Sequence, residues 1–207
     1  MDLRQKLLDG LEKLSLNYSE KTVGLLVDYL LLLIKWNKTY NLTAITNPEK
    51  MVSHHLLDSL AIASKIHANT LIDIGTGPGL PGIPLAIVNP EKSFTLVDSN
   101  GKKTRFLFEV KLALSLPNVK IEHNRCQAIS GEFDAVLSRA FSNLNDMLKV
   151  SNHLLFEKGS FWAMKGKYPE QEVDELLPGF ELKQVIKLDV PFVDEERHLL
   201  QIVRKPH

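Results

Sequence analysis

The stretch Leu71–Pro84 reads LIDIGTGPGLPGIP and passes from a strand pattern, through a turn with four glycines, into a helix pattern. Glycine adopts positive φ at little cost and lets backbone N–H groups approach a ligand without a Cβ in the way. A strand, a glycine turn and a helix N-terminus in this order are typical of a phosphate or nucleoside site. We therefore expect the rest of the chain to be organised around this turn.

The composition indicates a globular protein of ordinary size. The 207 residues are 44% hydrophobic and 24% charged, which fits one domain, or a core with a modest appendage. Lys plus Arg and Asp plus Glu number 25 each, so any nucleic-acid binding must depend on a local patch.

The single cysteine, Cys126, excludes an internal disulfide and fits a reducing compartment. The N-terminus has no secretory pattern, and the apolar run at 25–34 is too short to span a bilayer. We expect a cytoplasmic monomer without membrane contact.

Two regions follow each other along the chain. Residues 1–65 form a predicted helical extension, with Ser19 capping one helix and Asn47-Pro48-Glu49 starting another. Residues 66–207 form a predicted α/β core, with no clear linker between the two. Helical patterns separate the first five of seven strand patterns, which predicts a mostly parallel sheet. The last two are joined by a short loop, which predicts an antiparallel pair. The seven predicted strands cover residues 71–74, 93–97, 119–122, 133–137, 160–164, 182–188 and 199–203.

The glycine turn fits two cofactor patterns. From Gly77 it spells G-x-G-x-x-G, the dinucleotide fingerprint, with Asp98 about twenty residues further on to hold a ribose. From Gly75 it spells G-x-G-x-G with an acid, Asp73, two residues earlier, which is the pattern of S-adenosylmethionine-dependent methyltransferases. A carboxylate at Asp73 can orient the loop or contact the cationic end of that cofactor, so it favours the second pattern. Gly82 is then explained by helix-to-strand packing. A structural turn without a ligand is the third alternative.

Other chemistry-bearing side chains follow the strands, at the edge where open α/β sheets place ligands. Asp98 can accept ribose hydroxyls or cap the next helix. Cys126 and Gln127 follow the third strand, at the level of an adenine base, and nothing beside Cys126 indicates a nucleophile. His54 and His55 have no partner at metal-ligand spacing, so no metal site is predicted. Basic residues that can contact RNA, or simply form a solvated face, are Lys102, Lys103, Arg105, Lys165, Arg197 and His198.

Seven sequence blocks between residues 36 and 200 resemble one known family. They read WNKTYNLTAI, HHLLDS, DIGTGPGLPGIPLAI, LVDSNGKKTRFL, SRAF, MKG and ERHL. In this order they resemble the glucose-inhibited division protein B family, the guanine-N7 methyltransferases of 16S ribosomal RNA. The resemblance implies a class I, Rossmann-like methyltransferase fold with seven strands, an antiparallel last strand and an N-terminal helical extension. It also implies S-adenosylmethionine as cofactor and the small ribosomal subunit, or its assembly intermediate, as partner.

The resemblance also carries residue roles. It implies cofactor contacts at Gly75, Leu80, Cys126, Gln127 and Arg139. Family members often carry an acid where Gln127 stands, and an amide there can still pair with the adenine edge. Together with the turn and edge residues, the predicted cofactor set is Asp73, Gly75, Gly77, Gly79, Leu80, Asp98, Cys126, Gln127 and Arg139.

The chemistry of a ring nitrogen agrees with this resemblance. The N7 lone pair of guanine is nucleophilic as it stands, so its methylation requires alignment and electrostatic tuning rather than a general base. We therefore assign no catalytic residue and predict Arg139 and Lys165 as positioning residues. The chain has neither the Asn/Asp-Pro-Pro-aromatic block expected for exocyclic amines nor a Pro-Cys motif for carbon methylation. The alternatives are a nicotinamide-dependent oxidoreductase and a non-catalytic RNA-binding module on the same fold.

Overall fold

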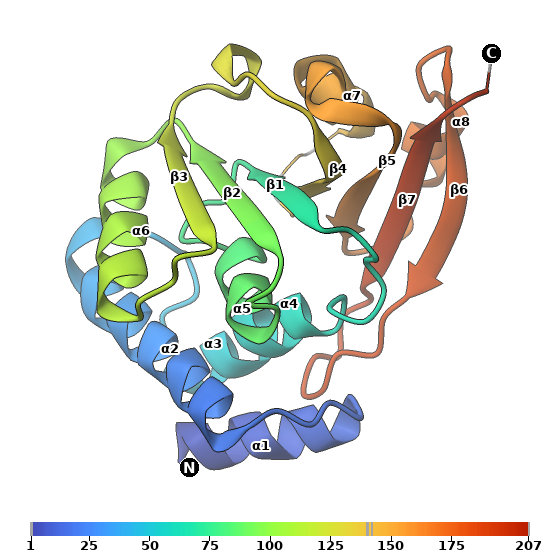
Figure 1. Cartoon of the computed structure of the whole chain (residues 1–207). Helices are drawn as coiled ribbons and strands as arrows, with labels where there is room; N and C mark the ends of the chain where they lie inside the picture. The colour runs from blue at the N-terminus through green and yellow to red at the C-terminus, as the bar shows by residue number, and fades with distance from the viewer. Residues whose placement is uncertain (1, 140, 142, 207) are drawn as a thin grey trace.

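The N-terminal region is helical, as its apolar spacing predicts (Figure 1). The computed structural model describes residues 2–139, 141 and 143–206, so Ala140 of the SRAF motif lies outside the described residues. The predicted caps are confirmed: the Ser19 hydroxyl accepts from the Thr22 N–H, and the Asn47 side chain accepts from the Lys50 N–H. The elements are α1 (Leu3–Lys13), α2 (Glu20–Tyr40), α3 (Pro48–Met51), the π-helix η1 (Val52–Leu57) and α4 (Asp58–Leu60).

The described residues form a seven-stranded sheet in the order β3-β2-β1-β4-β5-β7-β6. The strands are β1 (Thr70–Ile74), β2 (Ser93–Asp98), β3 (Val119–His123), β4 (Phe133–Ser138), β5 (Leu155–Lys165), β6 (Phe180–Lys187) and β7 (His198–Arg204). β1 to β5 pair in parallel, and β7 runs antiparallel to both β5 and β6. The predicted mostly parallel sheet with an antiparallel last strand is confirmed.

Two details of the predicted sheet are wrong. The fifth strand starts at Leu155, five residues before the predicted start, because a β-bulge carries its pairing with β4 across a polar segment. The connection from β3 to β4 contains only the 3₁₀ turn η2 (Cys126–Ala128) where a helix pattern was expected. The other connections hold α5 (Gly82–Val88), α6 (Gly101–Ala113), α7 (Leu144–Ser151), the 3₁₀ turn η3 (Asn152–Leu154) and α8 (Glu170–Asp174).

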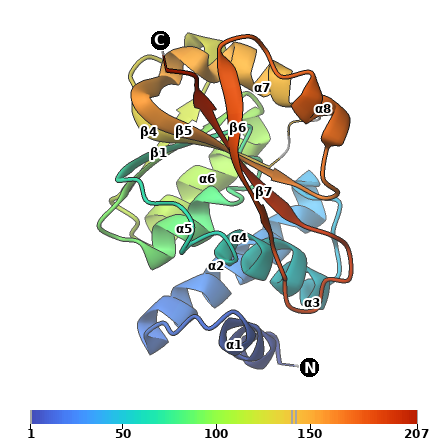
Figure 2. The ribbon, with the colours of Figure 1, turned by 90° about the vertical axis from the view of Figure 1, so that its right-hand side faces the viewer.

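The sheet is the middle of three layers, with α7 and α8 on one face and the other helices on the opposite face (Figure 2). Alternate strand residues point to opposite faces, so Ile72 packs toward α7 while Leu71 packs toward the larger helical layer. This larger cluster joins apolar residues of α1, α2, η1, α5 and α6. The N-terminal helices thus share a core with the sheet.

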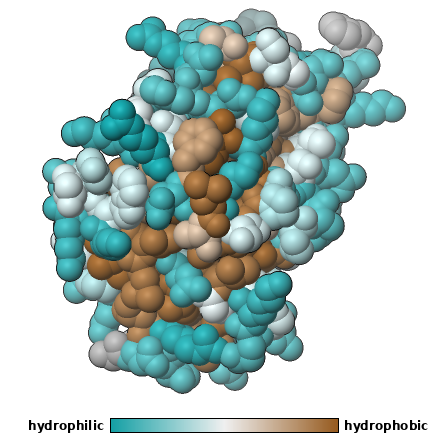
Figure 3. Space-filling view, turned by 60° about the vertical axis from the view of Figure 1, so that its left-hand side comes forward, coloured by the Kyte–Doolittle hydropathy of each residue, from teal (hydrophilic) through white to brown (hydrophobic). Residues whose placement is uncertain are grey.

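One flank of this helical layer is apolar at its surface. Figure 3 shows a brown area low on this side of the molecule. Large apolar side chains are exposed on α2 (Leu31) and on α6 (Phe108 and Leu112). In the described part of the chain, no helix has the length and apolar character needed to cross a membrane.

Candidate active site

Two glycines of the turn after β1 leave room for a ligand. Gly75 and Gly77 have φ of 64° and 63°, in the left-handed region that favours glycine. A Cβ on Gly75 would lie 3.7 Å from Phe141 Cε2, and one on Gly77 would lie 4.0 Å from Lys103 Nζ. Neither Cβ would clash with the protein, so the space that these glycines keep clear is available to a ligand.

The next two glycines serve packing. A Cβ on Gly79 would lie 2.4 Å from Ile83 Cγ1, and one on Gly82 would lie 2.2 Å from Leu96 Cδ2 on β2. Both contacts are far too short: Gly79 lets the turn pack against Ile83 of α5 and Leu107 of α6, and Gly82 lets α5 approach β2. The interpretation of Gly82 as a packing glycine is confirmed, which removes the need for a dinucleotide register.

Asp73 is a buried carboxylate at the end of β1. Its Oδ2 accepts from the Thr76 hydroxyl (2.6 Å) and from the Gly82 N–H (2.9 Å), which fixes both ends of the turn. Its Oδ1 is buried without a hydrogen-bond partner among the described residues. Burial raises the pKa of Asp73 to about 7. A buried carboxylate oxygen with no partner favours a cation nearby.

Asp98, at the end of β2, holds the turn from the other side. Its Oδ2 accepts from the Gly77 N–H (2.9 Å), and its Oδ1 accepts from the Asn100 N–H (2.8 Å). The Lys103 ammonium lies 3.8 Å from Oδ2. Asp98 therefore connects the glycine turn to the start of α6. It also borders a cleft at the carboxyl ends of the strands.

A cleft of about 620 Å³ opens at the carboxyl ends of β1, β2 and β3. It is bordered by Gly75, Asp98, Lys103, Cys126 and Gln127. The Cys126 thiol donates to the Val150 carbonyl oxygen (3.4 Å), and burial raises its pKa to about 11. Cys126 is therefore a thiol at neutral pH, which does not suit a nucleophile.

A smaller cleft of about 230 Å³ lies beside it and gathers Arg139, Lys165 and Arg197. Arg139 borders this cleft and is absent from the lining of the larger one. Lys165 Nζ donates to Glu172 Oε1 (3.0 Å) and Oε2 (2.9 Å) and to the Phe141 carbonyl oxygen (3.2 Å). The structure thus separates the predicted edge residues into two adjacent clefts.

Sequence reasoning missed Asp58, which the smaller cleft also includes. Its carboxylate accepts from Arg139 Nη1 (3.2 Å) and from Arg197 Nε (3.1 Å), and its side chain is 5% exposed. Arg139 Nη1 also donates to the His54 carbonyl oxygen (3.0 Å). The available signal was an acid inside an apolar helical segment, within the block HHLLDS.

The remaining predicted residues, including Asp73, Gly77 and Gly79 of the cofactor set, line neither cleft. Lys102 and Arg105 are exposed on α6, and Leu80 is buried in the core. His198 is buried, and its Nδ1 lies 2.7 Å from the Gly166 carbonyl oxygen, which indicates a structural role. In the described ranges, no three His, Cys, Asp or Glu side chains gather as a metal would require.

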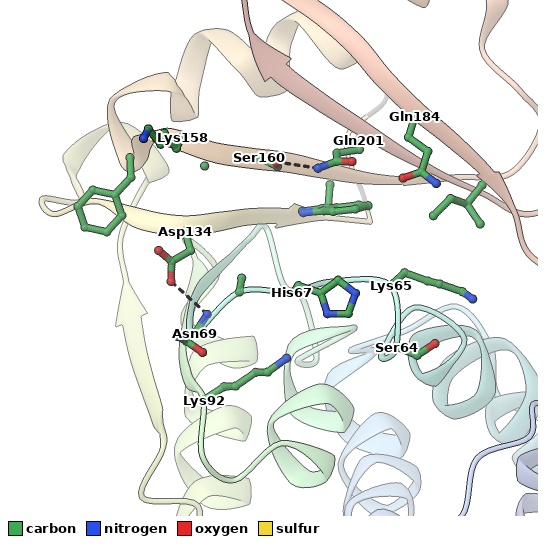
Figure 4. A pocket seen from close by; sticks show the side chains of 15 residues that line it. Ser64, Lys65, His67, Asn69, Lys92, Asp134, Lys158, Ser160, Gln184 and Gln201 are labelled. Carbon is green, nitrogen blue, oxygen red and sulfur yellow. Dashed lines mark hydrogen bonds between the residues drawn. The ribbon is translucent and has the colours of Figure 1, made fainter.

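Another cavity, about 790 Å³ and larger than either cleft, lies at the opposite edge, where the strands begin (Figure 4). Lysines and amides dominate its lining, and its carboxylate, Asp134, accepts from the Asn69 N–H and from Thr70. None of the predicted site residues borders it. Open α/β sheets bind ligands at the carboxyl ends of their strands, so the two smaller clefts are the candidate active site.

Comparison with known sequences identifies close relatives. Residues 23–200 match the family model for rRNA small subunit methyltransferase G, designated GidB. A ribosomal RNA small subunit methyltransferase G from Alteromonas mediterranea is 47% identical over 206 residues, covering 99% of this chain and 98% of the relative. The protein of the same name from Marinomonas sp. (strain MWYL1) is 50% identical over 198 residues, covering 95% of each.

Solved structures share the fold at low identity. A SAM-dependent methyltransferase from Aquifex aeolicus has a TM-score of 0.60 and 16% identity, covering 76% of this chain and 94% of that one. The ribosomal protein L11 methylase from Lactobacillus delbrueckii subsp. bulgaricus has a TM-score of 0.57 and 19% identity, covering 78% and 81%. These likenesses confirm the predicted methyltransferase fold.

Proposed function

The chain belongs to the family of ribosomal RNA small subunit methyltransferase G, and on this premise we propose that it transfers a methyl group from S-adenosylmethionine to N7 of a guanine in 16S ribosomal RNA. The family resemblance predicted from the seven sequence blocks is confirmed. The roles of individual residues in the two clefts are part of the proposal.

The larger cleft suits the cofactor. The observation that carries this assignment is the lining of the cleft, in which Gly75, Asp98 and Gln127 meet at the carboxyl ends of the strands. Behind the same glycine turn, the buried Asp73 has an Oδ1 without a hydrogen-bond partner among the described residues. When bound, S-adenosylmethionine supplies a methyl carbon on a cationic sulfur. Asp98 would hold the ribose, Gln127 would pair with the adenine edge, and the negative charge of Asp73 would attract the cationic end.

The smaller cleft suits the target base. Arginine and lysine side chains are the usual partners of the O6 and N7 edge of guanine. In this cleft Arg139 and Arg197 would hold the base by O6 and leave N7 free. Lys165, anchored by Glu172 and Phe141, would position it from the border of the cleft. With S-adenosylmethionine bound, the N7 lone pair would form the bond to the methyl carbon and the sulfur would leave with the electron pair of the broken carbon–sulfur bond. No proton moves, so the cleft needs alignment rather than a base.

The substrate and the assembly state are part of the same proposal. The chain acts in the cytoplasm as a monomer, on the small subunit or its assembly intermediate. Lys102, Lys103 and Arg105, at the start of α6, would contact RNA phosphates near the cofactor cleft. Residues 1–65 are the helical extension and 66–207 the methyltransferase core.

The test uses small subunits and free RNA from cells that lack this gene. The protein is incubated with labelled S-adenosylmethionine, and N7-methylguanine is located by chemical scission of the RNA. We expect label in 16S RNA at one guanine, and absence of transfer in every assembly state would contradict the proposal. A thermal-shift comparison tests the nicotinamide alternative, because S-adenosylhomocysteine should raise the melting temperature and NAD should not.

A further inference from the structure

We propose that Asp58 is a positioning residue for the methyl transfer. Its carboxylate holds the guanidinium groups of Arg139 and Arg197 at the border of the smaller cleft and offsets part of their positive charge. This inference rests on the proposed function, since it gives the smaller cleft the target base as its occupant. It assigns a role in catalysis to the N-terminal helices, which the sequence places outside the methyltransferase core.

The contacts of Asp58 use both of its carboxylate oxygens. Oδ2 accepts from Arg139 Nη1 (3.2 Å), which comes from the end of β4, 81 residues away in the sequence. Oδ1 accepts from Arg197 Nε (3.1 Å), which comes from the β6–β7 loop, 139 residues away. One buried carboxylate thus joins three parts of the chain at the wall of a single cleft.

The local backbone is shaped for these contacts. Asp58 follows the π-helix η1, and its N–H bonds to the Ser53 and His55 carbonyl oxygens. In an α-helix the same N–H would bond to the His54 carbonyl oxygen, four residues back. Here the His54 carbonyl oxygen accepts from Arg139 Nη1 (3.0 Å). The π-helix therefore gives Arg139 a second acceptor beside Asp58, and π-helical turns occur frequently at functional sites.

The charges of the cleft explain why a carboxylate is needed. Arg139, Lys165 and Arg197 bring three cations, against the carboxylates of Asp58 and Glu172. His55 adds no charge at neutral pH, because burial and the nearby Arg139 lower its pKa to about 4. His54 Nε2 also lies 3.6 Å from Glu195 at the rim.

Methyl transfer brings positive charge into this cleft. Guanine enters neutral and leaves as a cationic 7-methylguanine, so cations around it oppose the transition state. Asp58 keeps the two guanidiniums available as hydrogen-bond donors and reduces this opposition. Without the carboxylate, the guanidiniums would repel each other and lose their fixed orientation.

The test compares Asp58→Asn with Asp134→Asn. The amide at position 58 keeps the size of the side chain but cannot accept from both arginines. Asp134 serves as the control because its carboxylate also accepts several hydrogen bonds, at the far edge of the sheet. We expect Asp58→Asn to lower kcat with RNA by about 10- to 100-fold, as small misplacements of a reacting group do, and to leave the Kd of S-adenosylmethionine unchanged. Asp58→Glu, which keeps the charge, should recover part of kcat, and Asp134→Asn should keep it.

A second readout does not depend on activity. Arg197 Nε donates to Asp58 Oδ1, so its Nε–H signal in a ¹⁵N NMR spectrum should exchange slowly in the wild type and in Asp134→Asn. The signal should be lost in Asp58→Ala, which leaves no acceptor at this position. Its absence from the wild type would overturn the inference even if no RNA were methylated, so this result is distinct from failure of the proposed function. A kcat of Asp58→Asn within about twofold of wild type, or an equal loss of cofactor affinity, would also overturn it.

Discussion

The buried carboxylate of Asp73 should make cofactor binding depend on pH. Burial raises its pKa to about 7, so the carboxyl group is largely neutral in mildly acidic solution. The acid itself ionises near 3.8 in an unfolded chain, so the folded state binds the extra proton between about pH 4 and pH 7. Stability from this group is therefore greatest at the acid end of that window and falls as the pH rises through it. A bound cationic ligand favours the ionised carboxylate over the neutral carboxyl group, so the affinity for such a ligand should rise with pH.

The size of the effect follows from the fraction ionised. With a pKa of about 7, roughly one Asp73 in eleven is ionised at pH 6 and roughly ten in eleven at pH 8. If the ionised form is the one that attracts the cation, the affinity for S-adenosylmethionine should rise up to about tenfold between these pH values. Binding near pH 7 should release part of a proton from Asp73.

Isothermal titration calorimetry in buffers of different ionisation enthalpy measures both quantities. Asp73→Asn is the matched variant, because an amide oxygen can still accept from Thr76 and Gly82 at the position of Oδ2. It should bind with little pH dependence, while the cofactor's own titrating groups contribute equally to both proteins. Equal pH slopes for the wild type and Asp73→Asn would refute the assignment of the charge to Asp73.

Three further predictions concern the turn and the larger cleft. Gly77→Val should abolish cofactor binding in the same calorimetric assay and lower the free energy of unfolding by about 1–2 kcal/mol. The control is Gly179→Val, at another glycine with positive φ and open space around it, which should lower the stability but keep the affinity for the cofactor. Tyr29→Phe removes the hydroxyl that donates to the Pro78 carbonyl oxygen (2.9 Å) and should lower the free energy of unfolding in urea by about 1–3 kcal/mol; an unchanged midpoint would contradict it. Cys126, with a pKa of about 11, should react with iodoacetamide far more slowly at pH 8 than a free thiol, and a rate equal to that of glutathione would show that the thiol is not shielded.

The strands could be predicted because their signals are local. Short apolar runs bounded by glycine, proline or polar turns identify all seven, and the order of the motifs indicates the cofactor edge. The early start of β5 was missed because Glu157 and Lys158 interrupt the apolar run, while pairing with β4 continues past them. The β3–β4 connection was misjudged because residues 124–132 are polar and contain room for one helical turn, which the chain uses as a 3₁₀ turn.

The site was predicted less completely, because its division into two clefts depends on distant contacts. A sequence places Arg139 after a strand, and so at the ligand edge, but it does not indicate which neighbour receives its guanidinium. That neighbour, Asp58, lies in a helical segment in which an isolated acid usually marks a solvated face. Its burial follows from the packing of η1 on α1 and α2, and no local pattern encodes this packing.

The positions of the two carboxylates suit the movement of charge during the proposed reaction. In the proposed reaction positive charge would begin on sulfur beside the glycine turn, behind which the buried Asp73 has an oxygen without a partner among the described residues. It would end on the purine in the smaller cleft, where Asp58 is already shared by two arginines. After transfer the neutral sulfide no longer attracts Asp73, and the cationic purine lies among cations that Asp58 only partly offsets. On this proposal both products would be held less firmly than the reactants. Asp58 must balance two demands, since a stronger offset would favour transfer but retain the methylated base, and a weaker one would do the reverse.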